Sequence, residues 1–316
     1  MQVVAMLGGL ASQMSKYALY YGLSKMDNGS QCYIDTTAYH SQNMWNGYEL
    51  EKVFGIKESD LYDLYPVDIR ERPISYQYKA LEFLVQNNAM LYYNMGIGRR
   101  YYNPLSIYGR TLNGISGKIW RAKYLLNGKN NRFNLDNIRH GEAVYFDEGC
   151  EDFSVYYKYK DELKQIFAFP DFTDIRDVEL SKLMLKGNSV AVHIRRTDHL
   201  YDNDSLERSG YYKNAINLIE KCTGEEKLAY YVFSDDIKWV SENLSLVGLS
   251  NKEIVYVDWH KGEESFRDMQ LMTFCQHNVV PISGFSAMGS WLSKWDDKDK
   301  ITVAPKGEYP FLLKHI

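Results

Sequence analysis

The C-terminal half of the chain alternates short β-branched runs with amphipathic stretches, and this alternation restricts the possible folds more than any other feature. The predicted strands are Ser189–Ile194, Leu228–Phe233, Glu253–Val257, Asn278–Ile282 and Ile301–Val303. Between strands, Tyr211–Cys222 and Glu264–Cys275 place apolar side chains at helical spacing. Because parallel strands need crossover connections of this length, the order predicts an α/β fold with a parallel sheet and helices on both of its faces.

The N-terminal half begins with the same order of elements and then becomes less regular. Val3–Leu7 predicts a buried strand, and Gly8-Gly9 predicts a turn. Ser12 is the candidate N-cap of a helix that runs to about Lys25. Gln31–Asp35 predicts the next strand, and residues 36–150 are rich in Tyr, Asn and Gly. We therefore expect a second, less regular α/β domain with long loops.

The length of 316 residues suits two domains of roughly 150 residues each. We place the boundary between residues 165 and 166, so that residues 1–165 and residues 166–316 form the two domains. Hydrophobic residues make up 45% of the chain and charged residues 25%, which is typical of globular proteins and excludes a disordered or low-complexity chain. A net charge of -4 gives no reason to expect binding of nucleic acid.

The cysteines and the N-terminus favour a cytoplasmic protein. Cys32, Cys150, Cys222 and Cys275 lie far apart and form no CxxC pair, so reduced thiols are the simplest interpretation. No apolar run reaches the ~18–20 residues that a membrane span needs. The stretch Met1–Leu7 has no basic residue ahead of its apolar part, which favours a buried strand over a signal peptide.

One long segment is basic and free of acids. No Asp or Glu occurs from Phe83 to Leu135. The cations of this segment are Arg99, Arg100, Arg110, Lys118, Arg121, Lys123, Lys129 and Arg132. Such a block can dock on anionic lipid headgroups or bind an anionic substrate. The alternative is a solvated face whose charges are balanced elsewhere in the fold.

A pair of arginines follows the predicted strand Ser189–Ile194. In open α/β sheets, ligands bind at the carboxyl ends of the strands, where Arg195 and Arg196 would lie. Arginine offers a planar fork of donors that matches phosphate oxygens. His193 points to the same face as Arg195, and Asp198 can hold one guanidinium in place. The alternative is a salt-bridged strand end with a core histidine.

Two other strand ends carry polar residues. Ser234-Asp235-Asp236 follows a predicted strand, and one of its two acids can cap a helix while the other binds the N–H edge of guanine. Ser283-Gly284-Phe285-Ser286 opens a helix, where free backbone N–H groups and a hydroxyl can hold phosphate. Gly8-Gly9 turns into the first helix but lacks the GxGxxG pattern of dinucleotide sites.

Together these segments predict a nucleotide-sugar site. A departing diphosphate needs its developing charge stabilised, either by arginines and helix N-termini or by a divalent metal. Asp202 and Asp204 form an acid–x–acid pattern close after the arginines, so they are candidates for a metal site or for a general base.

The chain resembles the bacterial α-1,2-fucosyltransferases and, more broadly, the fucosyltransferase superfamily with an HxRRxD motif. Four segments match in order, namely Gly8–Met14, His193–Asp198, Phe233–Asp236 and Asp268–Trp291. The last is the most specific. The chain departs from the family pattern at Ala11, Ser12, Thr197, Ala287 and Met288.

The resemblance implies a GT-B fold, in which two Rossmann-like domains face each other across a cleft. The N-terminal domain would take the acceptor and the C-terminal domain the GDP-sugar. The implied activity is inverting transfer of L-fucose from GDP-β-L-fucose to a hydroxyl of a glycan, with no required metal. An α-1,2 linkage to a galactose-type residue of a surface polysaccharide, which can be lipid-linked, is the expected product. The basic segment 99–132 would then contact the inner face of the cell membrane.

The resemblance also implies roles for single residues. Arg195 would contact the β-phosphate, His193 and Asp235 would meet the guanine, and Arg196 and Asp198 would shape the site. The matched segments further assign Ser234, Ser283, Phe285, Ser286, Gly8, Gly9 and Gln13 to the donor site. The alternatives are a metal-dependent transferase that uses Asp202 and Asp204, a transferase for a different GDP-sugar, and a catalytically inactive homologue that binds nucleotide sugars or glycans.

Overall fold

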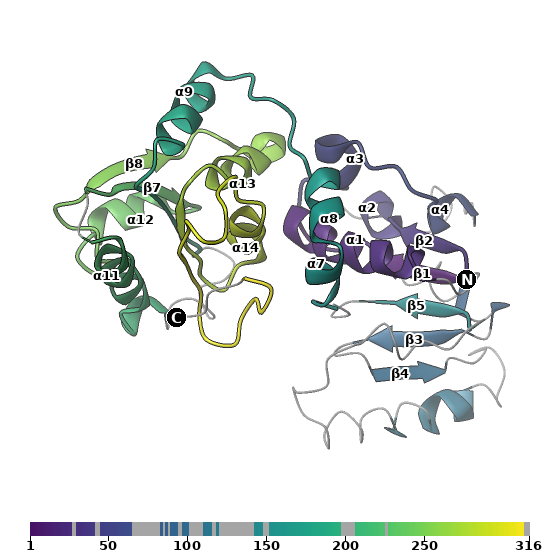
Figure 1. The fold of residues 1–316 in the computed structure, drawn as a ribbon. Helices are drawn as coiled ribbons and strands as arrows, with labels where there is room; N and C mark the ends of the chain where they lie inside the picture. The colour runs from purple at the N-terminus through teal and green to yellow at the C-terminus, as the bar shows by residue number, and fades with distance from the viewer. Residues whose placement is uncertain are drawn as a thin grey trace. The chain divides into compact units, whose positions relative to one another are not determined.

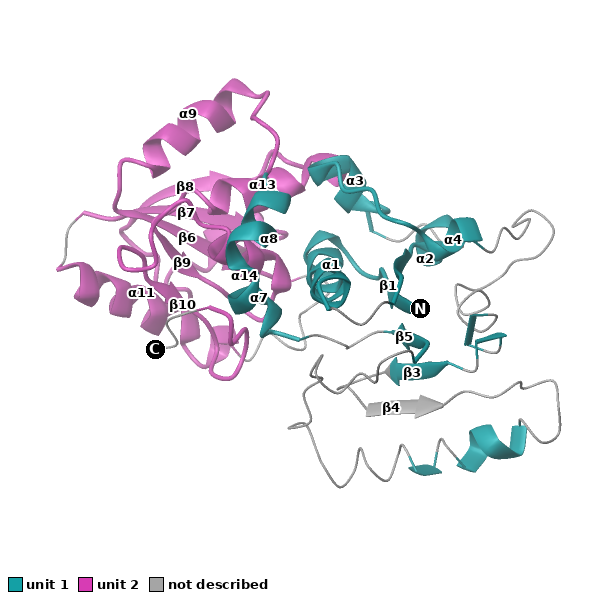
Figure 2. Ribbon diagram, turned by 45° about the vertical axis from the view of Figure 1, so that its right-hand side comes forward, with its two compact units in different colours: residues 1–168 teal, residues 169–316 magenta. Residues whose placement is uncertain are grey.

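The computed structural model describes the following residues of the chain: 1–26, 30–41, 45–64, 83–84, 86–87, 89–93, 97–100, 110–115, 118–119, 142–147, 152–196, 206–224 and 227–312. The chain divides into two compact units, Met1–Ala168 (unit 1) and Phe169–Ile316 (unit 2), which Figure 2 shows in different colours. The predicted boundary between residues 165 and 166 falls inside helix α8 (Lys160–Ile166). The assignment of acceptor and donor to these units stays a prediction.

Unit 2 contains the predicted parallel sheet. Its strand order is β10-β9-β6-β7-β8 (Figure 2), and all neighbouring strands are parallel, including β7 and β8, which are labelled in Figure 1 as well. The strands are β6 (Ser189–Ile194), β7 (Ala229–Ser234), β8 (Glu253–Val257), β9 (His277–Val279) and β10 (Thr302–Val303). The strand predicted over Asn278–Ile282 ends earlier, at Val279, because Pro281 has no N–H to donate to the ladder.

Helices cover both faces of this sheet, as predicted. They are α9 (Ile175–Met184), α11 (Tyr211–Thr223), α12 (Ile237–Glu242), α13 (Phe266–Met272) and α14 (Gly284–Trp291). Val190 and Val192 of β6 pack in one core cluster with side chains of α11 and α12. Ala191, which points the other way, packs in a second cluster with side chains of α9 and α13. The confirmed architecture is a doubly wound α/β sheet.

The order of the strands reverses beside β6. The chain proceeds from β6 to β7 and β8 on one side, and β9 and β10 lie on the other side of β6. In open α/β sheets the crevice at such a reversal is where ligands bind. A ligand of unit 2 is therefore expected near the segments that follow β6 and β9, which carry Arg195 and Ser286.

Unit 1 has its own five-stranded sheet, in the order β2-β1-β5-β3-β4, in which only the β3–β4 pair is antiparallel. The strands are β1 (Gln2–Ala5), β2 (Cys32–Asp35), β3 (Met90–Tyr93), β4 (Ile97–Arg100) and β5 (Val144–Phe146). Among the described residues, the helices with defined bounds are α1 (Leu10–Ser24), α2 (Thr37–Ser41), α3 (Glu49–Phe54), α4 (Leu61–Leu64), α7 (Val155–Lys158) and α8, and residues 83–84, 86, 110–115 and 118–119 are helical as well. A second Rossmann-like unit is thus present, as the resemblance implied.

The start of α1 differs from the prediction. The N-cap is Gly9, and Ser12 lies exposed in the first turn instead of capping the helix. The physical reason is the preceding turn, in which Gly8 has a φ of 86° and Gly9 is already extended, so that helical geometry begins at Leu10.

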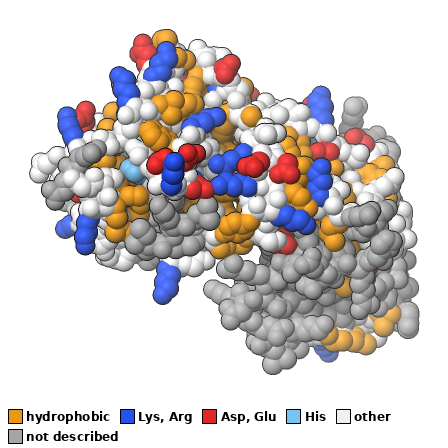
Figure 3. Space-filling model, viewed as in Figure 1, with side chains coloured by type: hydrophobic (Ala, Val, Ile, Leu, Met, Phe, Trp, Pro, Cys, Tyr) orange, Lys and Arg blue, Asp and Glu red, His pale blue; other side chains and the backbone are white. Residues whose placement is uncertain are grey.

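The surface gives two further observations. On the face drawn in Figure 3, Lys and Arg side chains are interspersed with Asp and Glu side chains among the described residues. Within the described ranges, no helix is both long enough and apolar enough to cross a membrane.

Candidate functional site

A hydrogen bond joins the end of β6 to α14, the helix that follows β9, where the strand order reverses. His193 of β6 lies with its Nδ1 2.8 Å from the Oγ of Ser286, in the first turn of α14. Both side chains are buried, and the ring of Phe285 lies 6.0 Å from that of His193. The first N–H groups of a helix have no acceptor within it and attract anions. His193 therefore fixes a potential phosphate-binding helix N-terminus against the end of β6.

Arg195 is the more accessible of the two arginines. Its Nη1 lies 3.4 Å from Oδ2 of Asp235, which follows β7, and 32% of its side chain is exposed. Its guanidinium is therefore held from one side by a carboxylate while an anion can reach it from solvent. This environment suits a group that stabilises a departing diphosphate.

Arg196 lies in a different environment. Its Nη1 donates to both carboxylate oxygens of Glu207, at 2.7 and 2.6 Å, and its guanidinium carbon lies 3.6 Å from the centre of the Trp239 ring. Only 14% of the Arg196 side chain and 3% of the Glu207 side chain are exposed. Arg196 therefore connects the end of β6 with Glu207 and Trp239, and its expected role in shaping the site stays a prediction.

The two consecutive acids after β7, Asp235 and Asp236, accept hydrogen bonds from different parts of the chain. Asp236 is the N-cap of α12 and accepts a hydrogen bond from the N–H of Trp239 at 3.1 Å. Asp235 accepts from the backbone N–H of Arg196 at 2.9 Å. The hydroxyl of Ser234 accepts from the N–H of Asp236 at 3.0 Å. One acid thus caps the helix, as predicted, and the other connects the ends of β6 and β7. Recognition of guanine by Asp235 stays a prediction.

Glu207 and Trp239 are functional candidates that the sequence did not reveal. Both contact Arg196, but they come from separate segments of the chain. For Trp239 a signal existed, because it lies in the first turn of the helix that Asp236 caps. For Glu207 no sequence pattern pointed to the contact.

In unit 1, the predicted donor residues Gly8 and Gly9 form the turn before α1, and Gln13 lies in the first turns of that helix. A Cβ on Gly8 would lie 2.7 Å from the Cβ of Ser12, and its φ is positive, so this position requires glycine. The buried Gln13 amide donates to the carbonyls of Gly8 and Gly47 at 3.0 and 2.9 Å. Gln13 therefore fixes the turn, while contact of these three residues with the donor stays a prediction.

Several predicted residues lie outside the residues that the structure describes. They are Thr197, Asp198, Asp202 and Asp204. Among the residues that are described, no group of three or more His, Cys, Asp and Glu side chains could hold a metal ion. Transfer without a metal, and the role of Asp202 or Asp204 as general base, stay predictions.

The basic segment 99–132 is described only in part. Its described side chains belong to residues 110–115 and 118–119, and they include Ile115 and Ile119, which are 50% and 53% exposed. Contact of this segment with the inner face of a membrane stays a prediction.

Comparison with known proteins decides the family. The sequence model of glycosyl transferase family 11 matches residues 132–313, which is more than half of the chain. The chain belongs to glycosyl transferase family 11. This result confirms the resemblance stated from the motifs and shows that the protein is a glycosyltransferase.

Two curated relatives of this family 11 glycosyltransferase come from Escherichia coli. One is named alpha-1,2-colitosyltransferase and is 24% identical over 309 residues, which cover 96% of this chain and 90% of the relative. The other is named O-antigen biosynthesis glycosyltransferase WbnK and is 28% identical over 220 residues, covering 66% and 68%. The crystal structure of fucosyltransferase NodZ from Bradyrhizobium matches with a TM-score of 0.50 at 14% identity over 92% of each chain, which shows the shared GT-B-like fold.

Two of the positions at which the chain departs from the family pattern are Ala287 and Met288. Both residues lie in α14 and are buried, with exposures of 0% and 2%. Next to them, a Cβ on Gly289 would lie 3.0 Å from the Cβ of Met272 in α13. The departure at Ala287 and Met288 therefore changes buried side chains of α14 and alters no exposed side chain.

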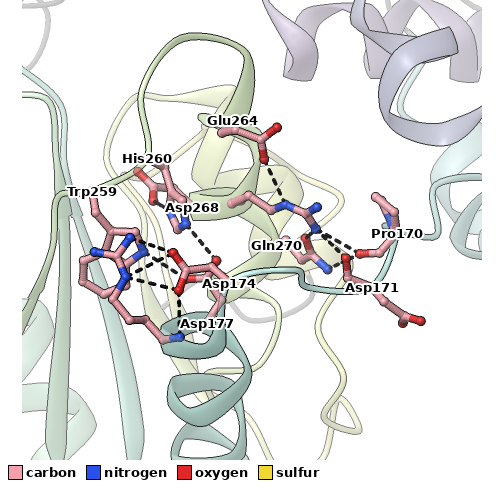
Figure 4. A network of polar contacts seen from close by, with 11 residues as sticks. Pro170, Asp171, Asp174, Asp177, Trp259, His260, Glu264, Asp268 and Gln270 are labelled. Carbon is pink, nitrogen blue, oxygen red and sulfur yellow. Dashed lines mark hydrogen bonds and ion pairs between the residues drawn. The ribbon is translucent and has the colours of Figure 1, made fainter.

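A second polar network of the enzyme lies beyond β8 (Figure 4). Nδ1 of His260 lies 2.6 Å from Asp268 Oδ1, and its Nε2 lies 3.0 Å from Asp177 Oδ2. The indole N–H of Trp259 donates to the other Asp177 oxygen at 3.0 Å. Arg267 donates to the carbonyls of Pro170 and Asp171, and Gln270 also donates to Pro170. The network fastens α9 and the segment before it to α13.

This network predicts a pH-dependent stability. Burial alone would lower the pKa of His260, but its contacts with Asp268 and Asp177 outweigh burial and raise the pKa above 6.5. The stabilisation is therefore complete below pH 6.5 and is lost as the pH rises through the folded-state value. We expect His260→Gln to lower the free energy of unfolding by about 1–2 kcal/mol at pH 6 and by less at pH 9. Urea unfolding at both pH values measures this difference, and an equal deficit at both would contradict the prediction.

Proposed function

We propose that this glycosyltransferase moves L-fucose from GDP-β-L-fucose to a hydroxyl of a glycan, with inversion at the anomeric carbon. The proposed acceptor is a galactose-type residue of a surface polysaccharide, joined in α-1,2 linkage. The names of the two relatives support this choice, because one denotes an α-1,2 transferase and the other an enzyme of O-antigen biosynthesis.

One observation carries the proposal. At the reversal of the strand order in unit 2, the partly exposed Arg195 and the N-terminus of α14 follow β6 and β9, which are neighbouring strands, and ligands of open α/β sheets bind at such a reversal. These are the parts that stabilise a diphosphate leaving group by charge and by backbone N–H groups.

The proposed reaction is a single displacement. The acceptor oxygen forms a bond to the anomeric carbon while the bond from that carbon to the β-phosphate oxygen breaks. GDP departs with the bonding electron pair, and Arg195 stabilises its growing negative charge. The hydroxyl proton passes to a general base, for which Asp202 and Asp204 are the candidates.

The proposed contacts do not distinguish one GDP-sugar from another, because they are assigned to the phosphate and the guanine. One relative is named for transfer of colitose. A different GDP-sugar is therefore the second candidate for the donor. The metal-dependent transferase and the inactive binding homologue are the other two alternatives.

Ligand-induced thermal shifts test the donor class. We expect GDP and GDP-fucose to raise the melting temperature, since a ligand at about 100 times its Kd adds about 2.7 kcal/mol of stability. UDP and UDP-sugars should have no effect. Stabilisation by UDP-sugars alone would refute the proposal, and GDP-mannose or GDP-colitose in the same screen identifies the sugar.

An assay of fucose transfer to galactosides tests the two remaining alternatives. Transfer that stops when a chelator is added would favour the metal-dependent transferase. GDP binding without any transfer would favour the inactive homologue.

A further inference from the structure

An exposed tryptophan lies on the glycine turn of unit 1. Trp45 is 59% exposed, and the Cδ1 and Cγ edge of its ring would lie 3.7 and 3.9 Å from a Cβ on Gly9. The ring therefore contacts the turn along one edge, and most of its remaining surface faces solvent. Single exposed apolar residues are common on proteins, so exposure alone assigns no role to Trp45.

The backbone of Trp45 gives the second observation. Its φ is 48°, in the left-handed region that bulky residues rarely adopt. Residues held in such conformations gather at ligand sites, where the surrounding structure imposes them. Here the surrounding structure is well defined, because Gln13 donates to Gly47 and accepts from the N–H of Glu49 at 2.8 Å. The chain is thus fixed just after Trp45 by the same glutamine that fixes the glycine turn.

The position in the sheet gives the third observation. Gly8 and Gly9 follow the carboxyl end of β1, which is flanked by β2 on one side and by β5 on the other. The strand order of unit 1 reverses between β1 and β5, so this edge is where a ligand of unit 1 is expected. The hydroxyl of Tyr39 donates to the carbonyl of Gly8 at 2.6 Å. The turn Gly8–Gly9 beside Trp45 is therefore fixed by Tyr39 as well as by Gln13.

The chemistry of the ring defines the ligand. A fixed indole face offers a flat apolar surface with an N–H at its rim, which suits the C–H face of a sugar ring whose hydroxyls remain hydrated. We propose that Trp45 binds a sugar ring of the glycan acceptor and determines which acceptor unit 1 selects. This inference rests on the proposed function, because it takes the second substrate to be a glycan.

The test compares acceptor and donor kinetics in matched variants. With GDP-fucose as donor and the best acceptor of a galactoside panel, we expect Trp45→Ala to raise the KM for the acceptor about tenfold. The KM for GDP-fucose and the rate of its hydrolysis by water should stay unchanged. Trp45→Phe should restore most of the acceptor affinity. Tyr157→Ala, which removes another exposed aromatic of unit 1, should leave both KM values unchanged.

A binding measurement separates this inference from the proposed function. Saturation-transfer NMR with the same galactosides needs neither donor nor turnover, and contact with the wild-type protein that disappears in Trp45→Ala would support the inference. An unchanged acceptor KM in Trp45→Ala, or galactoside contacts equal in the variant and the wild type, would overturn it. Absence of galactoside contact in the wild-type protein would overturn it as well. Failure of GDP to bind, in contrast, refutes the proposed donor and leaves these binding results interpretable.

Discussion

Replacing Arg195 by alanine is expected to lower the rate of transfer about a hundredfold to a thousandfold. The Arg195 side chain is 32% exposed where the strand order of unit 2 reverses, and the carboxylate of Asp235, 3.4 Å from its Nη1, holds the guanidinium in place before the reaction begins. A preorganised donor of this kind contributes about 3–4 kcal/mol to stabilising the charge of the leaving group. The measurement is kcat and kcat/KM with GDP-fucose and a galactoside acceptor.

Two further variants show whether the loss of rate is specific to the guanidinium of Arg195. Arg195→Lys keeps the charge but removes the planar fork, so it should recover only part of the rate. Arg176→Ala is the matched control, because Arg176 is also paired with an aspartate, Asp174, but lies exposed at the start of α9. It should leave transfer unchanged. Near-normal transfer by Arg195→Ala would contradict the role of Arg195 in stabilising the leaving group, whereas absence of fucose transfer by the wild-type protein would contradict the proposed function.

Replacing Glu207 by glutamine is expected to have the largest effect on stability. Glu207 is almost fully buried and makes two hydrogen bonds to the guanidinium of Arg196. Its removal leaves the buried guanidinium with the more distant carboxylate of Asp236, 3.4 Å from its Nε, so we expect a cost of about 3 kcal/mol, the lower end for breaking a buried ion pair. We expect GDP affinity to fall as well, about tenfold, because the backbone N–H of Arg196 holds Asp235.

A double-mutant cycle with Arg196→Met distinguishes loss of the Glu207–Arg196 ion pair from a general loss of core packing. If Glu207 acts through Arg196, the double variant Glu207→Gln/Arg196→Met should lose less stability than the sum of the two single variants, by about 1–3 kcal/mol. The same non-additivity should appear in the Kd for GDP. Additive losses in both quantities would show that Glu207 has no specific connection with the arginine.

The elements of unit 2 could be predicted because their signals are local. β6 and β8 begin and end at the predicted residues, and α11 begins at Tyr211 as expected. Alternation with a period of two, or apolar spacing with a period of 3.6, is visible in a short stretch of sequence. The misplaced start of α1 shows the limit of this reasoning, since Ser12 is a good N-cap by type but the geometry of Gly8 and Gly9 set the helix start earlier.

The sequence by itself determined the strand–helix order, the polar segments at the strand ends and, through His193–Asp198 and the other matched segments, the family. Only the tertiary structure decided that Arg195 is partly exposed and that Arg196 is largely buried in an ion pair with Glu207, although the two residues are adjacent and chemically identical. It also revealed Glu207 and Trp45. The physical reason is that exposure and ion pairing depend on side chains from distant segments, which come together only when the strands align and the helices pack on them.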